Sequence, residues 1–152
     1  MTRAAPRTAI QRKEDTLNRL AHDEDAWVAT ADPATGTPYL IPLSFLWDGS
    51  TLLVSTPASS RTSLNLQATG KIRVGIGPTR DVVLIAGTVQ LVASADITDE
   101  VGDAFAAKTG FDPRDQTNAY VYFRIRPERV QAWREANELE DRTLMRGSSW
   151  LV

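Results

Sequence analysis

The sequence lacks cysteine and contains one histidine, His22. The absence of cysteine excludes disulfides, zinc–thiolate sites, iron–sulfur clusters and thiol catalysis. A single histidine excludes metal sites built from several histidines and disfavours a Ser-His-Asp hydrolase. His22 stands in the acidic stretch H-D-E-D, near the end of an expected helix, so we interpret it as a surface residue.

Long apolar runs are absent too. No run approaches the roughly 18 residues that span a bilayer, and the basic N-terminus has no apolar segment of the kind that a secretory signal needs. Net charge is small, at -2, so the composition gives no indication of a nucleic-acid partner. We therefore expect a cytoplasmic protein whose partners include neither nucleic acid nor a membrane.

Two common enzyme motifs are missing. The stretch G-I-G-P-T-R (75–80) lacks the third glycine of a dinucleotide fingerprint and has a proline where a helix should begin. No G-x-S-x-G nucleophile elbow occurs. The length of 152 residues predicts one domain over 1–152, with residues 1–7 as a loose tail.

What the sequence does contain is a series of short strand patterns. Residues 39–47 alternate between two faces, Asp48-Gly49 is a hairpin signal, and residues 51–55 return. Pro42 cannot donate a ladder hydrogen bond, so its strand should be bulged or at an edge there. Further strands are expected over 26–31, 71–77, 81–92, 119–125 and 129–133. Six or so strands with few helices predict a mainly β fold, a small antiparallel barrel.

Three helices are expected around this barrel. The first covers residues 8–21, and its apolar face should contain Ile10, Leu17, Leu20 and Ala21, with solvated charges elsewhere. The second begins after Ser59 or Ser60, reaches residue 68 and is stopped by Gly70. The third begins at Thr98 and ends before Gly110.

The start of the second helix, S-S-R-T-S-L-N-L (59–66), has two interpretations. In one, a serine caps the helix and Arg61 is an exposed side chain. In the other, the unpaired N–H groups and positive dipole end of the helix bind an anion together with Arg61 and the hydroxyls of Ser60 and Thr62. The stretch by itself leaves both open.

Taken with the preceding strands, this stretch resembles the pyridoxamine-phosphate-oxidase-like split barrels. These are homodimeric proteins that bind a flavin or deazaflavin. The similarity extends over residues 27–91, with a further piece at 130–142. It implies a six-stranded antiparallel split β-barrel with a few peripheral helices.

The resemblance also implies cofactor-binding residues. Family members have a hydroxyl residue at the end of a strand and then Ser-Arg-Lys at the start of a helix. The equivalent positions here would contact the cofactor ring and its phosphate, and Thr62 in place of the lysine removes one cationic contact. The implied cofactor contacts are Leu43, Ser44, Ser55, Thr56, Ser60, Arg61, Thr62 and Asn65.

The C-terminal piece adds two residues to this set. Family oxidases carry a tryptophan and, further on, Arg-x-His-x-Arg. Here Trp133 and Arg142 match the residues that the second subunit lends to the cofactor, whereas Glu138 and Glu140 replace the arginine and histidine that handle the substrate phosphate. Acidic residues would repel that phosphate. The resemblance thus implies a relative other than a true pyridoxamine-phosphate oxidase.

The expected function is an oxidoreductase that uses bound FMN or coenzyme F420 for hydride transfer to a small organic substrate, as a homodimer with the cofactor between subunits. FMN is slightly favoured, because Ser63, Asn65 and Gln67 rather than lysines surround Arg61. Other cations could fold close to that site and shift the balance: Arg7, Arg12, Lys13, Arg73 and Arg80.

No catalytic side chain and no metal ligand can be assigned. The substrate pocket is expected from loop 112–118 and a docked C-terminal tail. The alternatives are a non-catalytic flavin carrier or sensor and a haem-degrading split barrel.

Overall fold

The computed structural model describes residues 4–152, which form eight strands and three α-helices. The strands are β1 (Asp25–Ala31), β2 (Pro38–Trp47), β3 (Leu52–Pro57), β4 (Lys71–Ile76), β5 (Val82–Val92), β6 (Tyr120–Trp133), β7 (Thr143–Arg146) and β8 (Ser149–Trp150). The helices are α1 (Ala9–His22), α2 (Arg61–Thr69) and α3 (Asp99–Thr109), with 3-10 turns η1 (Ser94–Asp96), η2 (Pro113–Asp115) and η3 (Ala136–Glu138). No helix among these residues is long and apolar enough to cross a membrane.

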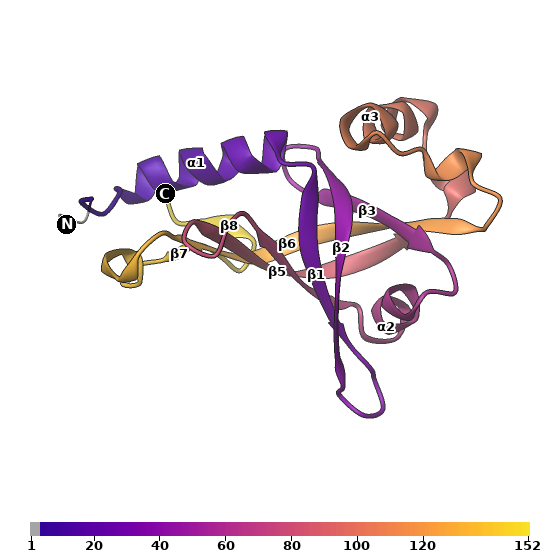
Figure 1. The fold of residues 1–152 in the computed structure, drawn as a ribbon, viewed down its shortest axis with the longest axis horizontal. Coiled ribbons are helices and arrows are strands. Elements are labelled where there is room, and N and C mark those ends of the chain that lie inside the picture. Colours follow the sequence, from indigo (N-terminus) through magenta and orange to yellow (C-terminus); the bar gives the residue numbers. More distant parts are fainter. Residues whose placement is uncertain (1–3) are drawn as a thin grey trace.

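Six strands close into a barrel in the order β3-β2-β1-β4-β5-β6, because β6 pairs with β3 as well as with β5. Every pairing in this ring is antiparallel. The strands β7 and β8 extend the sheet beyond β6 as a hairpin, and the helices lie at the periphery (Figure 1). The predicted mainly β, six-stranded antiparallel split barrel with peripheral helices is confirmed.

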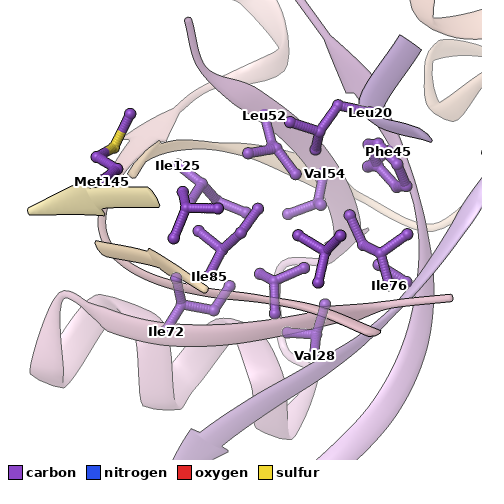
Figure 2. Close-up of a cluster of buried hydrophobic side chains, with 14 of the residues drawn as sticks. Leu20, Val28, Phe45, Leu52, Val54, Ile72, Ile76, Ile85, Ile125 and Met145 are labelled. Atoms are coloured by element: carbon purple, nitrogen blue, oxygen red, sulfur yellow. The ribbon is translucent and has the colours of Figure 1, made fainter. Parts of the chain in front are cut away.

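Aliphatic side chains fill the barrel, since alternate residues of each strand point inward. In β4, Ile72, Val74 and Ile76 are buried while Lys71 and Arg73 are exposed. Figure 2 shows the central part of this cluster, to which α1 and most of the strands contribute side chains. Each such burial contributes about 1.5–3 kcal/mol, so the alternation holds the ring closed.

The buried face of α1 agrees with the prediction at Leu20 and at Leu17, which packs against the core, and differs from it elsewhere. Ile10 is 64% exposed, whereas Arg12, Thr16 and Leu20 are buried.

Arg12 donates from Nη1 to the carbonyl oxygen of Asp141 at 2.8 Å and from Nη2 to that of Arg7 at 3.2 Å, whereas its buried Nε has no partner among the described residues. The aliphatic part of an arginine side chain can cover apolar surface while its guanidinium bonds to oxygen atoms. Arg12 can therefore be part of the buried face of α1, where only apolar residues were expected.

Two residues of the expected loose tail over 1–7 contact the C-terminal segment, and the first is Ala4, whose carbonyl oxygen accepts from Asn137 Nδ2 at 3.0 Å. Residues 1–3 lie outside the described part of the chain. Arg7 donates to both carboxylate oxygens of Glu138, from Nη2 to Oε1 at 2.8 Å and from Nε to Oε2 at 3.0 Å. The chain is therefore anchored to its C-terminal segment just before α1 begins.

The ring is open along part of one side. β2 pairs with β3 only over Phe45–Trp47, and towards its start it pairs with β1 alone. Pro42 lies in the part of β2 that does not pair with β3, so the prediction that its strand is at an edge there is correct. The pairing of this part with β1 contains no bulge. We call the gap between the start of β2 and the end of β3 the seam.

Candidate functional site

The first turn of α2 follows directly on the end of β3. Ser60 caps the helix by accepting a hydrogen bond from the Ser63 N–H at 3.1 Å, and its Oγ lies 2.9 Å from Thr56 Oγ1. The N–H groups of Arg61 and Thr62 are among those that a helix N-terminus leaves without an intrahelical partner. The predicted cap and the donors needed for an anion site therefore coexist here.

The side chains of this turn face two ways. Arg61 is 54% exposed and only loosely paired with Asp32, at 3.8 Å. Thr62 and Asn65 are buried, and Asn65 donates from Nδ2 to Thr30 Oγ1 at 3.1 Å. Thr62 Oγ1 and Asn65 Oδ1 have no protein partner among the described residues. An anion arriving from solvent would thus meet the Arg61 and Ser60 side chains and the backbone N–H groups, rather than these two side chains.

A pocket of about 290 Å³ lies at the seam, and we call it the seam pocket. It brings together four of the predicted cofactor residues, Leu43 and Ser44 from β2 with Ser55 and Thr56 from β3. The Thr56–Ser60 contact joins it to the start of α2. Its remaining lining residues are Pro42, Pro57, Phe105, Phe111 and Tyr120.

The aromatic residues of this lining were missed by the sequence analysis. Phe105 lies on α3, Phe111 just after it and Tyr120 at the start of β6, so the connection between β5 and β6 supplies one wall of the pocket. Phe111 and Tyr120 flank the 112–118 loop that was expected to border a substrate pocket. Their aromatic character within a polar connection was the available signal.

Trp133 and Arg142 lie next to one another and away from the seam pocket. The Arg142 guanidinium carbon is 5.5 Å from the centre of the Trp133 ring. Tyr120 pairs with Pro57 at one end of β6, and Trp133 is at the other end, roughly 40 Å further at about 3.3 Å per residue. Figure 1 shows β7 and the end of β3 on opposite sides of the barrel. One copy of the chain therefore does not bring all the predicted cofactor residues together.

Several large apolar side chains are exposed on the outer surface of β1, β2 and β5, beside Arg73 of β4. Trp27 is 55% exposed, Leu40 59% and Leu84 38%. These three residues border a hollow of about 440 Å³ that Val82, the pairing partner of Trp133, also lines. We call this surface the apolar sheet face. The sequence analysis did not identify it.

The two acidic residues of the C-terminal piece differ in environment. Glu140 is exposed, whereas Glu138 is buried and its carboxylate binds Arg7 and the Arg134 N–H. Hydrogen bonding by the Arg7 side chain lowers the pKa of Glu138 from its usual 4.5 to about 2. Glu138 therefore holds the chain's own N-terminal segment. His22 lies on the last turn of α1, where its Nδ1 is 2.8 Å from the Asn18 carbonyl oxygen.

Fold and site together define an antiparallel split barrel in which the N-terminus of α2 lies beside an open seam. The family model for pyridoxamine 5'-phosphate oxidase matches residues 14–134, and the chain belongs to that family. A search among curated proteins gave no match.

Solved structures share the fold at low sequence identity. An F420 reductase is 19% identical, with 74% of this chain and 93% of that chain covered and a TM-score of 0.61. An FAD-binding protein from Mesorhizobium loti is 18% identical, with 82% and 93% covered and a TM-score of 0.62. General Stress Protein 26 from Bacillus anthracis is 14% identical, with 80% and 92% covered and a TM-score of 0.59.

Proposed function

We propose that this protein is a cytoplasmic oxidoreductase that binds FMN or coenzyme F420 and passes hydride to a small organic substrate. The observation that carries the proposal is the 2.9 Å Thr56–Ser60 contact, which connects the seam pocket to the anion-binding turn of α2. A phosphorylated cofactor with a planar ring needs both an anion site and an adjacent slot. The names of two structural neighbours, an F420 reductase and an FAD-binding protein, support a cofactor of this class.

The residues present fit such a group. Arg61, Ser60 and the first N–H groups of α2 would hold a phosphate. Leu43, Ser44, Ser55 and Thr56 would flank a ring at the seam. When bound, the cofactor supplies the hydride chemistry, while the protein orients the reactants and excludes water. The described lining residues include no carboxylate, histidine or lysine, and Tyr120 is the lining residue whose phenol could donate a proton; we assign it no such role.

FMN is the first cofactor to test. The acidic tail of F420 would favour additional cations close to Arg61. Four of the candidate cations are engaged in other contacts: Arg7 with Glu138, Arg12 with the Asp141 carbonyl, Lys13 with the Val152 carbonyl and Arg80 with Glu135. This supports the slight preference for FMN.

We further propose that two copies of the chain build each cofactor site. The apolar sheet face offers a surface for a second copy, and the Trp133–Arg142 pair borders it through Val82. A second copy could then lend this pair to a site that one chain leaves incomplete. The exposed tryptophan and leucines support this arrangement, since apolar patches of this kind mark interaction surfaces.

The test of the cofactor proposal is a fluorescence titration of the protein with FMN and with F420. Arg61→Ala should weaken binding of the preferred cofactor roughly tenfold, the lower end of the range for hydrogen bonds to charged groups, because Arg61 is half exposed. Arg80→Ala is the matched control, since Arg80 is an exposed arginine paired with Glu135. Failure of the wild-type protein to bind either cofactor would overturn the proposal.

The lack of a carboxylate, histidine or lysine among the described lining residues of the seam pocket favours one second candidate, a flavin carrier or sensor without turnover. Such a protein would bind the cofactor and respond to Arg61→Ala in the same way. The two candidates separate when the reduced cofactor is mixed with a panel of oxidised organic acceptors. Reoxidation above the rate of free cofactor supports the enzyme, and cofactor binding without it supports the carrier.

A further inference from the structure

A third hollow, of about 260 Å³, lies where the β7–β8 hairpin meets the turn between β2 and β3, and we call it the hairpin pocket. Its lining includes Trp47 and residues 49–51 from β2 and that turn, Met145 and Trp150 from the β7–β8 hairpin, and Arg126 and Pro127 from β6. None of the described residues that line it also lines the seam pocket or the hollow of the apolar sheet face. The hairpin pocket is therefore separate from the sites described above.

Strand β3 lies between the hairpin pocket and the seam pocket. Thr51, just before β3, lines the hairpin pocket, and Pro57, the last residue of β3, lines the seam pocket. At 3.3 Å per residue these two positions are roughly 20 Å apart. A small molecule in one pocket therefore does not reach the other.

The inner part of the hairpin pocket is apolar. Met145 and Pro127 are buried, and Met145 lies at one edge of the buried cluster drawn in Figure 2. Trp47 and Trp150 are partly buried and pack against the same cluster. Two indole rings offer flat contact surfaces to another ring. Since a protein cavity of about 150 Å³ can hold benzene, this pocket has room for one ring with a small substituent.

Hydrogen bonds hold the β7–β8 side of the pocket in place. Ser148 donates from Oγ to the Pro127 carbonyl oxygen of β6 at 2.9 Å. Lys13 of α1 donates to the Val152 carbonyl oxygen at 2.6 Å, and its ammonium lies 5.0 Å from the centre of the Trp150 ring. The hairpin is thus tied both to β6 and to α1. A site that is formed in advance loses less conformational freedom when a ligand binds.

Arg126 supplies a positive charge at this pocket. Its side chain is exposed, and it forms no ion pair or hydrogen bond with the side chains of the described residues. Asp48, beside the 49–51 turn, is already engaged by Arg124 Nη1 at 3.2 Å and by Thr51 Oγ1 at 2.6 Å. Glu128 is exposed on the same strand and forms no ion pair with Arg126. The Arg126 guanidinium is therefore available to a carboxylate, which arginine can bind through two parallel hydrogen bonds.

We propose that the hairpin pocket is a second ligand site, which takes a small carboxylic acid with one flat apolar ring. The ring lies against Trp47 and Trp150, and the carboxylate pairs with Arg126. Binding here needs neither a cofactor nor a second copy of the chain, so the inference does not depend on the proposed function.

The test is a titration of the full chain with benzoate, followed through the indole N–H signals in NMR spectra. The chain has four tryptophans, of which Trp47 and Trp150 line the pocket, whereas Trp27 and Trp133 do not. Benzoate should shift the first two signals and leave the other two in place, with a Kd of about 1 mM, as suits a ligand of so few atoms. Substituting one tryptophan at a time by phenylalanine assigns the four signals.

Benzamide tests the role of Arg126, because it has nearly the same shape as benzoate and no charge. It should bind about tenfold more weakly, since hydrogen bonds between charged groups are the stronger ones. Arg126→Gln should abolish this preference and leave the affinity for benzamide unchanged. Arg129→Gln is the matched control, because Arg129 is an exposed arginine of the same strand that does not line the pocket, and it should keep the preference.

Two results would overturn the inference. One is the absence of any shift at Trp47 and Trp150 in about 10 mM benzoate, or shifts confined to Trp27 and Trp133. The other is a preference for benzoate that survives Arg126→Gln, because the carboxylate would then have a different partner.

Discussion

At the scale of single residues, Glu138 stays ionised inside the protein because Arg7 reaches it. The side chain of Glu138 is 2% exposed and that of Arg7 9%. Glu138→Gln would remove the charged acceptor of the hydrogen bonds from Arg7, while Arg7 would keep its ion pair with Asp15 at 3.0 Å, so the variant should lower the unfolding free energy at pH 7 by about 2 kcal/mol. Urea unfolding measures this directly.

The pH dependence of the same variant is a separate expectation. The folded-state pKa of Glu138 is lowered, to about 2. Its stabilising contribution is therefore complete above about pH 4.5 and is lost as the pH falls towards 2. The difference between wild type and Glu138→Gln should shrink over that window. Glu135→Gln, in the exposed pair with Arg80, should show a much smaller cost, and an equal cost in both variants would contradict the argument.

Residue-scale predictions from the sequence succeeded where the local pattern determines the contact. Ser60 caps α2 as predicted, because its side chain bonds within one turn. Arg12 was expected in solvent, and its burial depends on a carbonyl 129 positions away in the chain. Thr62 and Asn65 are buried, Asn65 against Thr30 of β1, which their spacing did not indicate; their contact with the cofactor stays a prediction. Helix rotation and distant partners do not appear in local spacing.

At the scale of elements, strand β6 runs unbroken past Pro127 because a bulge absorbs the missing donor. Its register with β5 shifts where Gly87 faces Pro127. A Cβ at Gly87 would lie 2.6 Å from the Arg126 carbonyl oxygen, a contact with backbone that cannot move aside. Gly87→Ala should therefore lower the unfolding free energy by about 1–3 kcal/mol, as overpacked sites do.

Gly75→Ala is the matched control for Gly87. A Cβ there would meet Leu84 at 3.5 Å, an ordinary contact, and Gly75 lies in the neighbouring strand β4. Its stability should be unchanged or slightly raised, since alanine reduces the freedom of the unfolded chain. Equal destabilisation of the two variants in urea would show that the close approach at Gly87 is not the cause.

Elements were predictable where periodicity and turn signals coincide. The alternation in β4 and the Asp48-Gly49 hairpin gave strands close to the observed ones. The β7–β8 hairpin was missed, because its strands of four and two residues are too short to show an alternating pattern around the Gly147-Ser148 turn. Contact with β6 stabilises that turn, through Ser148 N–H bonding to the Glu128 carbonyl at 3.0 Å.

At the scale of the whole molecule, the proposed second copy would cover the apolar sheet face. Leu40→Glu would place a charge on that face, and a charge buried between two copies without a partner is costly. We expect the variant to sediment as a monomer at concentrations where the wild type is a dimer. Its FMN affinity should fall at least about tenfold, because the Trp133–Arg142 pair of the other copy would be lost.

Leu91→Glu is the control for this experiment, since Leu91 is similarly exposed but does not border the hollow of that face. It should leave both association and cofactor binding unchanged. A wild-type protein that sediments as a monomer would contradict the two-copy site. A Leu40→Glu monomer that still binds FMN as tightly as wild type would place the whole cofactor site within one chain. Because Trp133 lies at the far end of β6 from the seam, Trp133 and Arg142 would then not belong to the cofactor site. The seam pocket and the first turn of α2 would bind the cofactor alone.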